Sequence, residues 1–269
     1  MLEVLQLQFF QHALIAGIFV SIACGIIGPL VVINRMTFIS GGIAHAAYGG
    51  IGLAFFLGIS PILGAIGFTL VIAFVLAAIS IKRKERTDTF IGVIWAVGMA
   101  FGVILIDLSP GYNMDLMSFL FGSILVIPTS DLYIMLVLDI LILLFIGFNY
   151  RELLAMSYDD EFATTMGVPV NVLYFILIAL IALTVIVTIR LVGLILVIAL
   201  LTIPPYISEY YSRSLIKMMG LSIVFNLIFI VAGLYFAYAL DITSGATIIA
   251  TASVGFFLNF FWNWARQRI

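Results

Sequence analysis

The chain has 269 residues, of which 65% are hydrophobic and only 9% are charged, and its formal net charge is −2 at pH 7. A soluble globular protein is about half apolar and about a quarter charged. The composition therefore excludes an ordinary soluble domain and indicates an integral membrane protein.

Long apolar runs recur along nearly the whole sequence, and about 20 helical residues cross a hydrocarbon core of roughly 30 Å. These runs are apolar at every phase, unlike the alternating segments of a transmembrane β-barrel, so the predicted spans are helices. We predict an all-α, polytopic helical bundle with nine spans, at residues 9–33, 41–57, 62–81, 90–108, 132–148, 170–189, 191–207, 218–240 and 246–264.

Two of the nine spans are weak, so we expect eight to ten transmembrane helices. Residues 41–57 are glycine-rich and short, and residues 191–207 end in Pro204 and Pro205. No loop is long enough to form a soluble domain. We therefore expect residues 1–269 to form a single transmembrane domain.

Positive charge lies on one side of the predicted membrane. When nine spans are threaded alternately, ten of the eleven Lys and Arg residues share a side: Arg35, Lys82, Arg83, Lys84, Arg86, Arg151, Arg213, Lys217, Arg266 and Arg268. Short loops rich in Lys and Arg stay cytoplasmic, so we expect a cytoplasmic C-terminus and, with nine spans, an external N-terminus. The first positive charge follows the first apolar run, so we expect that run to be a retained span rather than a cleaved signal peptide.

The opposite side receives only Arg190 among the basic residues, and four carboxylates fall at or near it: Asp107, Asp115, Asp131 and Asp241. A concentration of carboxylates raises the local concentration of cations. The alternative is that these are ordinary carboxylates at helix ends.

Small residues recur at every fourth position in the second span, where they allow a neighbouring helix to approach closely: Gly42, Ala46, Gly50, Ala54 and Gly58. His45 lies beside this stripe. A histidine at membrane depth is costly unless it faces a partner or a water-filled path, so a functional role is our first hypothesis. The alternative is a structural histidine bonded to a backbone carbonyl, since one histidine without a nearby carboxylate is a poor metal site.

Asp139 lies in the middle of the fifth span, and an intramembrane carboxylate likewise needs a partner or a path. The other informative segment is the connection at about residues 150–168. It is amphipathic, carries a cluster of acidic side chains at Asp159 to Glu161, and ends at Gly167 and Pro169. Membrane-surface helices favour Lys and Arg, so this acidic segment predicts a protein partner instead.

Six segments follow one another along the chain: RMTFISGGIAHAAYGGIGLAFFLG (35–58), RTDTFIGVIWAVGMAFGVIL (86–105), DLMSFLFGSIL (115–125), YDDEFATTMGVPV (158–170), RLVGLILVIALLTIPP (190–205) and DITSGATI (241–248). In this order they resemble the membrane-spanning permease subunits of metal ABC importers, the ABC-3 family that imports zinc, manganese or iron. Together they cover almost the full length of the chain.

This resemblance implies a pair of permeases, expected to be a homodimer, with two cytoplasmic ATP-binding subunits beneath and an external metal-binding lipoprotein or periplasmic protein. It also implies a multi-pass protein of a prokaryotic cell membrane with no nucleic-acid partner. By the same resemblance, the segment from Tyr158 to Gly167 is the coupling helix that docks into the ATPase, through Tyr158, Asp159, Asp160, Glu161, Phe162, Ala163 and Gly167.

The resemblance further implies a divalent metal ion as substrate, with a path for which we name His45, Asp139 and Asp107. The chain has no G-x-x-x-x-G-K-[ST] phosphate loop, so ATP is expected on the partner subunit. We therefore expect a transport subunit that is not itself an enzyme and binds no cofactor.

The chain departs from the family around the histidine. Many relatives carry an Asp four residues before the histidine, a Ser directly before it and a Pro four residues after it, where this chain has Gly41, Ala44 and Gly49. A carboxylate one turn before an imidazole would supply two metal ligands from one helix face. Here the metal is held more weakly, a neighbouring helix donates the carboxylate, or the substrate differs.

Three alternatives stay open. An ABC permease for a metal chelate, such as a siderophore or a corrinoid, has a similar architecture but is usually longer. An ATP-independent secondary transporter or channel would show inverted repeats and paired intramembrane charges, which this sequence does not. An intramembrane enzyme would need a nucleophile and base or several metal ligands, and two histidines are too few.

Overall fold

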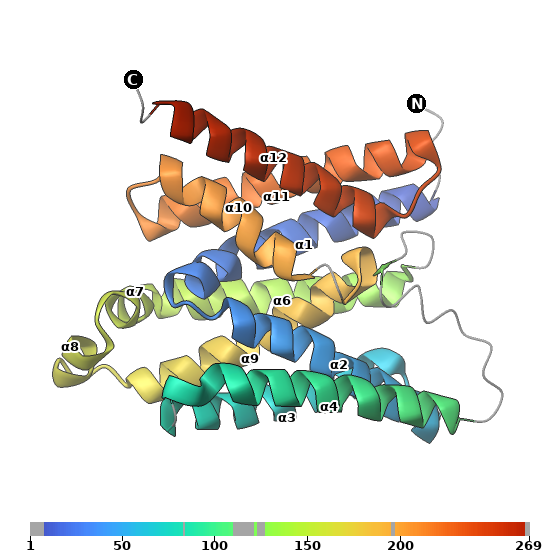
Figure 1. Ribbon diagram of the computed structural model, residues 1–269, viewed down its shortest axis with the longest axis horizontal. Coiled ribbons are helices and arrows are strands. Elements are labelled where there is room, and N and C mark those ends of the chain that lie inside the picture. Colours follow the sequence, from blue (N-terminus) through green and yellow to red (C-terminus); the bar gives the residue numbers. More distant parts are fainter. Residues whose placement is uncertain (1–7, 83, 110–120, 123–126, 195–196, 267–269) are drawn as a thin grey trace. The chain divides into compact units, whose positions relative to one another are not determined.

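A computed structural model describes residues 8–82, 84–109, 121–122, 127–194 and 197–266. Arg83, Asp115, Arg268 and most of the segment 115–125 lie outside this range. The helices are α1 (Gln8–Ile33), α2 (Thr37–Leu57), α3 (Pro61–Lys82), α4 (Thr87–Asp107), α6 (Thr129–Phe148), α7 (Tyr150–Tyr158), α8 (Asp160–Thr165), α9 (Val170–Val192), α10 (Val197–Tyr211), α11 (Leu215–Leu240) and α12 (Ser244–Arg266), with a 3₁₀ turn, η2, at Lys84–Arg86 (Figure 1).

Eight of the described helices are long and apolar enough to cross a membrane: α1, α2, α3, α4, α6, α9, α11 and α12. The prediction of an all-α membrane protein with eight to ten spans is therefore confirmed. Seven of the nine predicted ranges match these helices closely, and the glycine-rich second one is longer than predicted because α2 begins at Thr37.

The predicted span at residues 191–207 is wrong in its boundaries. The preceding helix, α9, continues to Val192 and ends where Gly193 adopts a left-handed φ of 87°. The next helix, α10, has 15 residues with Pro204 and Pro205 inside it, so it is about 22 Å long and shorter than a hydrocarbon core.

The described chain falls into two compact units. Unit 1 comprises Met1–Val32, Met117–Asp139 and Val187–Ile269, and unit 2 comprises Ile33–Leu116 and Ile140–Ile186. The expectation of a single transmembrane domain stays a prediction.

In unit 1, α10, α11 and α12 pack together and neighbouring members run antiparallel (Figure 1). The antiparallel pairing of α11 and α12 is shown by two close approaches, of Gly233 to Ile248 and of Gly255 to Phe229. α10 is short, but it too runs antiparallel to α11, the helix that follows it (Figure 1). Consequently α11 begins and α12 ends at the same end of the unit. The predicted topology, which places the basic residues on one side of the membrane, requires this.

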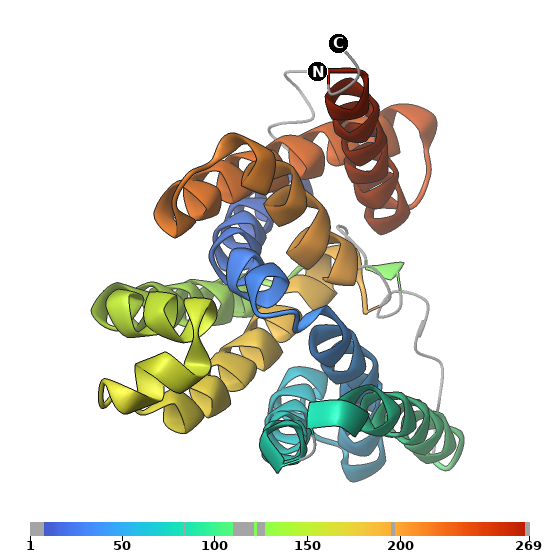
Figure 2. The same cartoon turned by 60° about the vertical axis from the view of Figure 1, so that its left-hand side comes forward.

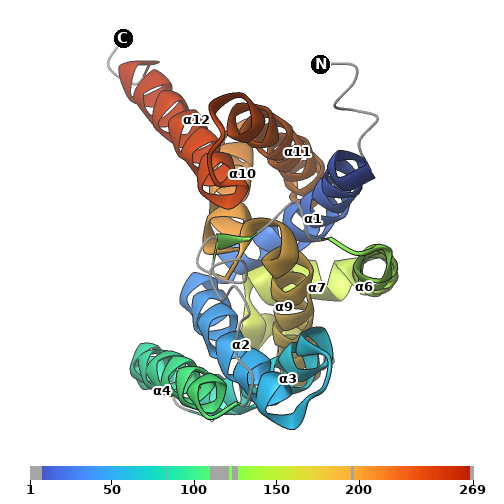
Figure 3. The ribbon, with the colours of Figure 1, turned by 90° about the vertical axis from the view of Figure 1, so that its right-hand side faces the viewer.

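In unit 2, α2 lies between α3 and α4 and packs against both (Figures 2 and 3). Small residues face one another at these contacts. Gly50 of α2 meets Gly64 of α3, and Gly52 of α2 meets Gly102 of α4. Contacts of this kind let helix backbones approach closely in a membrane, where apolar side chains gain little from leaving lipid.

The contact between α2 and α4 predicts a difference between two glycine substitutions. A Cβ at Gly52 would lie 2.7 Å from the Cα of Gly102, so Gly52→Ala must push two backbones apart. We expect it to lower stability by about 1–3 kcal/mol, the usual cost of overpacking. Gly92→Ala on α4 is the matched control, because its Cβ would meet nothing within 4 Å. Thermal unfolding in detergent measures both, and equal midpoints would contradict the close approach.

Candidate functional site

His45 lies in α2, buried in unit 2 with 7% of its surface exposed. Its ring stacks on the indole of Trp95 from α4, with 3.9 Å between ring centroids and 9° between ring planes. Within the described part of the chain, no hydrogen bond to a ring nitrogen accompanies this stack. The described residues therefore do not form the alternative arrangement, in which the histidine is bonded to a backbone carbonyl.

The stack exists because α4 comes unusually close to α2. Gly98, three residues after Trp95, would place a Cβ 2.7 Å from the Cα of Ala46, directly after His45. Gly102 lies one turn further along the same face and meets the backbone of Tyr48. Small residues on both helices thus bring the indole onto the imidazole.

The predicted stripe of small residues has two neighbours rather than one. Gly42 and Ala46 face α4, whereas Gly50 and Ala54 face α3. The prediction that Gly58 belongs to this stripe is wrong. Gly58 is the C-cap of α2 with φ 68°, and a Cβ there would meet nothing within 4 Å, so it ends the helix instead of packing against a neighbour.

Asp107 and His45 are both in unit 2, but the structure does not bring them together. Asp107 is the exposed last residue of α4, 12 residues from Trp95 and therefore about 18 Å along the helix axis. Asp139 belongs to unit 1, in α6, with 2% of its surface exposed and no hydrogen-bond partner for either carboxylate oxygen among the described residues.

The described residues contain no group of three or more His, Cys, Asp or Glu side chains that could hold a metal ion. The assignment of His45, Asp139 and Asp107 to a metal path thus stays a prediction. Of the carboxylates expected at the external side, the described ones lie at helix ends: Asp107 ends α4, Asp131 is in the first turn of α6 and Asp241 is the C-cap of α11.

The predicted coupling segment forms two short helices, α7 and α8, joined at Asp159. This residue has an extended backbone, and its carboxylate accepts a hydrogen bond of 2.9 Å from the backbone N–H of Phe162, which caps α8. Gly167 follows α8 with φ 85°, a conformation that favours glycine. Asp159 and Gly167 therefore flank the two ends of α8.

Large apolar side chains project from this segment into solvent. Tyr158, Phe162 and Met166 are 86%, 61% and 69% exposed, and Glu161 beside them is exposed as well. Only Ala163 of α8 is buried. Exposed apolar side chains grouped with acidic ones are typical of a surface that docks a protein partner.

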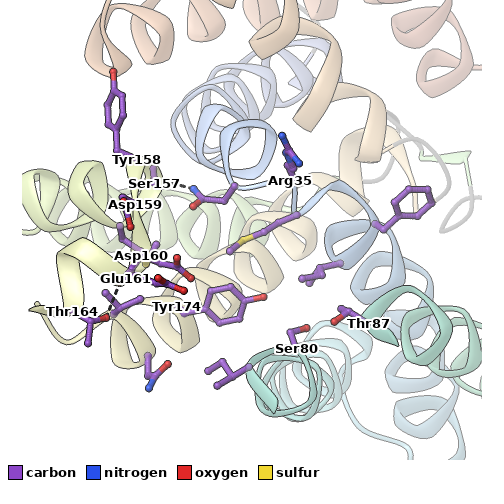
Figure 4. A pocket seen from close by; sticks show the side chains of 18 of the residues that line it. Arg35, Ser80, Thr87, Ser157, Tyr158, Asp159, Asp160, Glu161, Thr164 and Tyr174 are labelled. Carbon is purple, nitrogen blue, oxygen red and sulfur yellow. Dashed lines mark hydrogen bonds between the residues drawn. The ribbon is translucent and has the colours of Figure 1, made fainter. Parts of the chain in front are cut away.

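A cavity of about 1010 Å³ lies beside the α7–α8 segment within unit 2. Asp159, Asp160 and Glu161 line one side of it (Figure 4). The other side is formed by the turn between α1 and α2 and by the connection between α3 and α4, through Arg35, Ser80 and Thr87. Near the turn, Asn34 donates a hydrogen bond of 2.9 Å to the hydroxyl of Ser157. The α7–α8 segment thus lies at the end of unit 2 that carries Arg35 and the basic α3–α4 connection.

The model of the ABC 3 transport family matches residues 6–263. The chain belongs to this family. An uncharacterized membrane protein of Synechocystis sp. is 48% identical and covers 96% of this chain and 92% of its own length. The manganese transport system membrane protein MntC of Halalkalibacterium halodurans is 32% identical, covering 97% of this chain and 89% of its own. The manganese import system permease protein ScaB of Streptococcus parasanguinis is 34% identical, covering 95% and 91%.

Two solved structures are similar to this member of the ABC 3 family. PsaBC from Streptococcus pneumoniae in complex with Fab has a chain that is 32% identical, with a TM-score of 0.87 over 96% of this chain and 94% of that one. An inward-facing conformation of a putative metal-chelate type ABC transporter has a TM-score of 0.74 at 16% identity, over 93% and 84%. That second likeness shows the fold alone.

One residue that contacts His45 was not predicted from the sequence. The family segment 86–105 contains Trp95, which was not among the predicted site residues. The signal that could have found it is the run Trp95, Gly98 and Gly102, which gives α4 a small-residue face opposite the stripe of α2.

Proposed function

We propose that this chain is the membrane permease subunit of an ABC importer that moves a divalent transition-metal ion, manganese first and zinc second, into the cell. Manganese is favoured because MntC and ScaB, which match nearly the whole chain, are named as manganese transport proteins. The observation that carries the proposal is the buried imidazole of His45, which has no hydrogen-bond partner among the described residues.

A single imidazole suits a site that binds a metal ion weakly and releases it, rather than one that retains the ion. Imidazole is a ligand for several divalent transition metals, and carboxylates or water suit manganese. His45 is not part of a larger ligand group within the described residues, so an ion at this position would be held weakly. Weak ligation supports transport because an ion that binds too tightly does not leave.

The energy for transport comes, in this proposal, from separate ATP-binding subunits. The segment formed by α7 and α8 would dock one ATPase, and a second copy of the permease would dock another, giving a homodimer above two ATPases. ATP closure then favours one of two permease conformations. The absence of a phosphate loop from the sequence supports a chain that does not hydrolyse ATP itself.

The direction of transport follows from the distribution of charge. The side with ten Lys and Arg residues is assigned to the cytoplasm, which includes the C-terminus and the α7–α8 segment. The opposite side of a prokaryotic inner or plasma membrane would receive the ion from an external metal-binding protein. No cofactor is needed by this chain in the scheme.

Competition for uptake tests the identity of the substrate. In vesicles that contain the permease, its ATPase and its binding protein, we expect free Mn²⁺ to be taken up and an excess of siderophore-bound iron to leave the rate unchanged. Competing Zn²⁺ ranks the two favoured ions. Uptake of the chelate instead of the free ion would replace the proposal with the chelate-permease alternative.

A further inference from the structure

We infer that Trp95 is a positioning residue for the metal-binding imidazole, holding the His45 ring by its face so that the ring nitrogens stay open to the passing ion. This inference rests on the proposed function. It concerns how the site is built, which neither the family match nor the relatives' names address.

The stacked geometry leaves the metal-binding atoms free. The lone pair through which an imidazole nitrogen binds a metal lies in the plane of the ring, whereas the indole covers one face at 3.9 Å with the planes 9° apart. A hydrogen bond to one nitrogen would orient the ring equally well but would occupy a potential ligand atom. Stacking orients the ring and occupies neither nitrogen.

The ring needs such support because little else fixes it. The terminal torsion of histidine has a broad energy profile, so hydrogen bonds or packing must choose the ring plane. The described residues make no hydrogen bond to the imidazole ring of His45, which leaves its packing. On that face the packing is the indole, held in place by Gly98 against Ala46.

An indole also suits a ring that becomes positively charged. When imidazole binds a divalent ion, part of the ion's charge passes to the imidazole ring. The face of an aromatic side chain attracts positive charge, and tryptophan does so more strongly than tyrosine or phenylalanine. Phenylalanine would keep a flat face with weaker attraction. Leucine would offer neither property.

Fluorescence tests the contact directly. The chain has three tryptophans, and Trp262 and Trp264 are both exposed on α12. In a Trp262→Phe/Trp264→Phe protein assembled with its ATPase, Trp95 is the only permease tryptophan, and paramagnetic Mn²⁺ at the stacked imidazole should quench its emission in a saturable way. An ATPase-only sample supplies the background, and the same titration with His45→Ala should show no saturable component.

Uptake kinetics supply the second measurement. We expect Trp95→Leu to raise the KM for Mn²⁺ about tenfold, the size expected for loss of a desolvated contact between a cation and an aromatic face. Trp95→Phe should restore KM to within about threefold of wild type, since phenylalanine keeps part of that attraction. Phe90→Leu, a half-exposed aromatic residue elsewhere on α4, is the matched control and should leave KM unchanged.

The outcomes separate this inference from the proposed function. If His45→Ala loses uptake, but either Trp95→Leu keeps the wild-type KM or saturable quenching persists in His45→Ala, Trp95 does not position the ring and the function stands. If His45→Ala keeps both uptake and quenching, His45 is not on the path and the proposed function itself fails at this residue. If Trp95→Leu does not fold, the quenching measurement still tests whether the ion binds beside the His45 ring, and the KM of Trp95→Phe tests the positioning.

Discussion

Replacing His45 with alanine should lower ATP-driven manganese uptake by about 10- to 100-fold, because removing even a residue that only supports a metal ligand costs that much. The imidazole is buried at membrane depth with its nitrogens unbonded within the described chain, so its removal takes away a ligand and little internal bonding. The measurement is the initial rate of Mn²⁺ uptake in vesicles containing the permease, the ATPase and the binding protein.

The other histidine provides the control for this substitution. His12 of α1 donates a 2.8 Å hydrogen bond to the carbonyl of Ile127, so its imidazole has a structural partner. His12→Ala should cost about 1 kcal/mol of stability through the lost hydrogen bond, with uptake close to wild type. An unchanged rate for His45→Ala would assign His45 to packing.

Reversing the charge of Asp160 and Glu161 should reduce association with the ATPase at least tenfold while the permease still inserts into the membrane. Both lie on α8 next to exposed Phe162, and like charges placed across an interface cost several kcal/mol. Asp159 should be left unchanged, because its carboxylate caps α8 and its loss would destabilise the helix being tested by about 1 kcal/mol. Co-purification of the ATPase at graded salt measures the effect.

A matched acidic residue controls for net charge. Glu85 is exposed in η2, on the side assigned to the cytoplasm, but it lies outside the α7–α8 segment. Glu85→Lys should leave ATPase association near wild type. If Asp160→Lys/Glu161→Lys retains the ATPase as well as Glu85→Lys does, the partner does not dock on α8.

The helices were predictable because their signal is local. The apolar run at residues 62–81 became Pro61–Lys82, and the run at 170–189 became Val170–Val192. The end of the acidic connection at Gly167 was predictable for the same reason. Its division at Asp159 was not predicted, and the expected single coupling helix from Tyr158 to Gly167 is wrong, because Tyr158 ends α7 and Asp159 caps α8. Hydropathy alone did not show that α9 would end before Gly193 or that a shorter helix would begin at Val197.

The site was less predictable because it depends on which helices meet. His45 stood out as the only histidine deep in a span, but its neighbour Trp95 is 50 residues away in the sequence and on a different helix. Gly58 satisfied the four-residue spacing of the stripe and still had a different role, because spacing does not distinguish the end of a helix from its interior. Contacts between helices are set by tertiary packing.

The central claim is that this chain carries a metal ion inward at the expense of ATP hydrolysed by a partner on the α7–α8 side. The most direct measurement is Mn²⁺ accumulation in vesicles containing the assembled complex, with ATP supplied to one face only and Mn²⁺ with the binding protein to the other. We expect Mn²⁺ to accumulate against a gradient on the ATP side, and no accumulation when ATP is withheld. Mn²⁺ movement at the same rate without ATP, or accumulation on the opposite side, would contradict it.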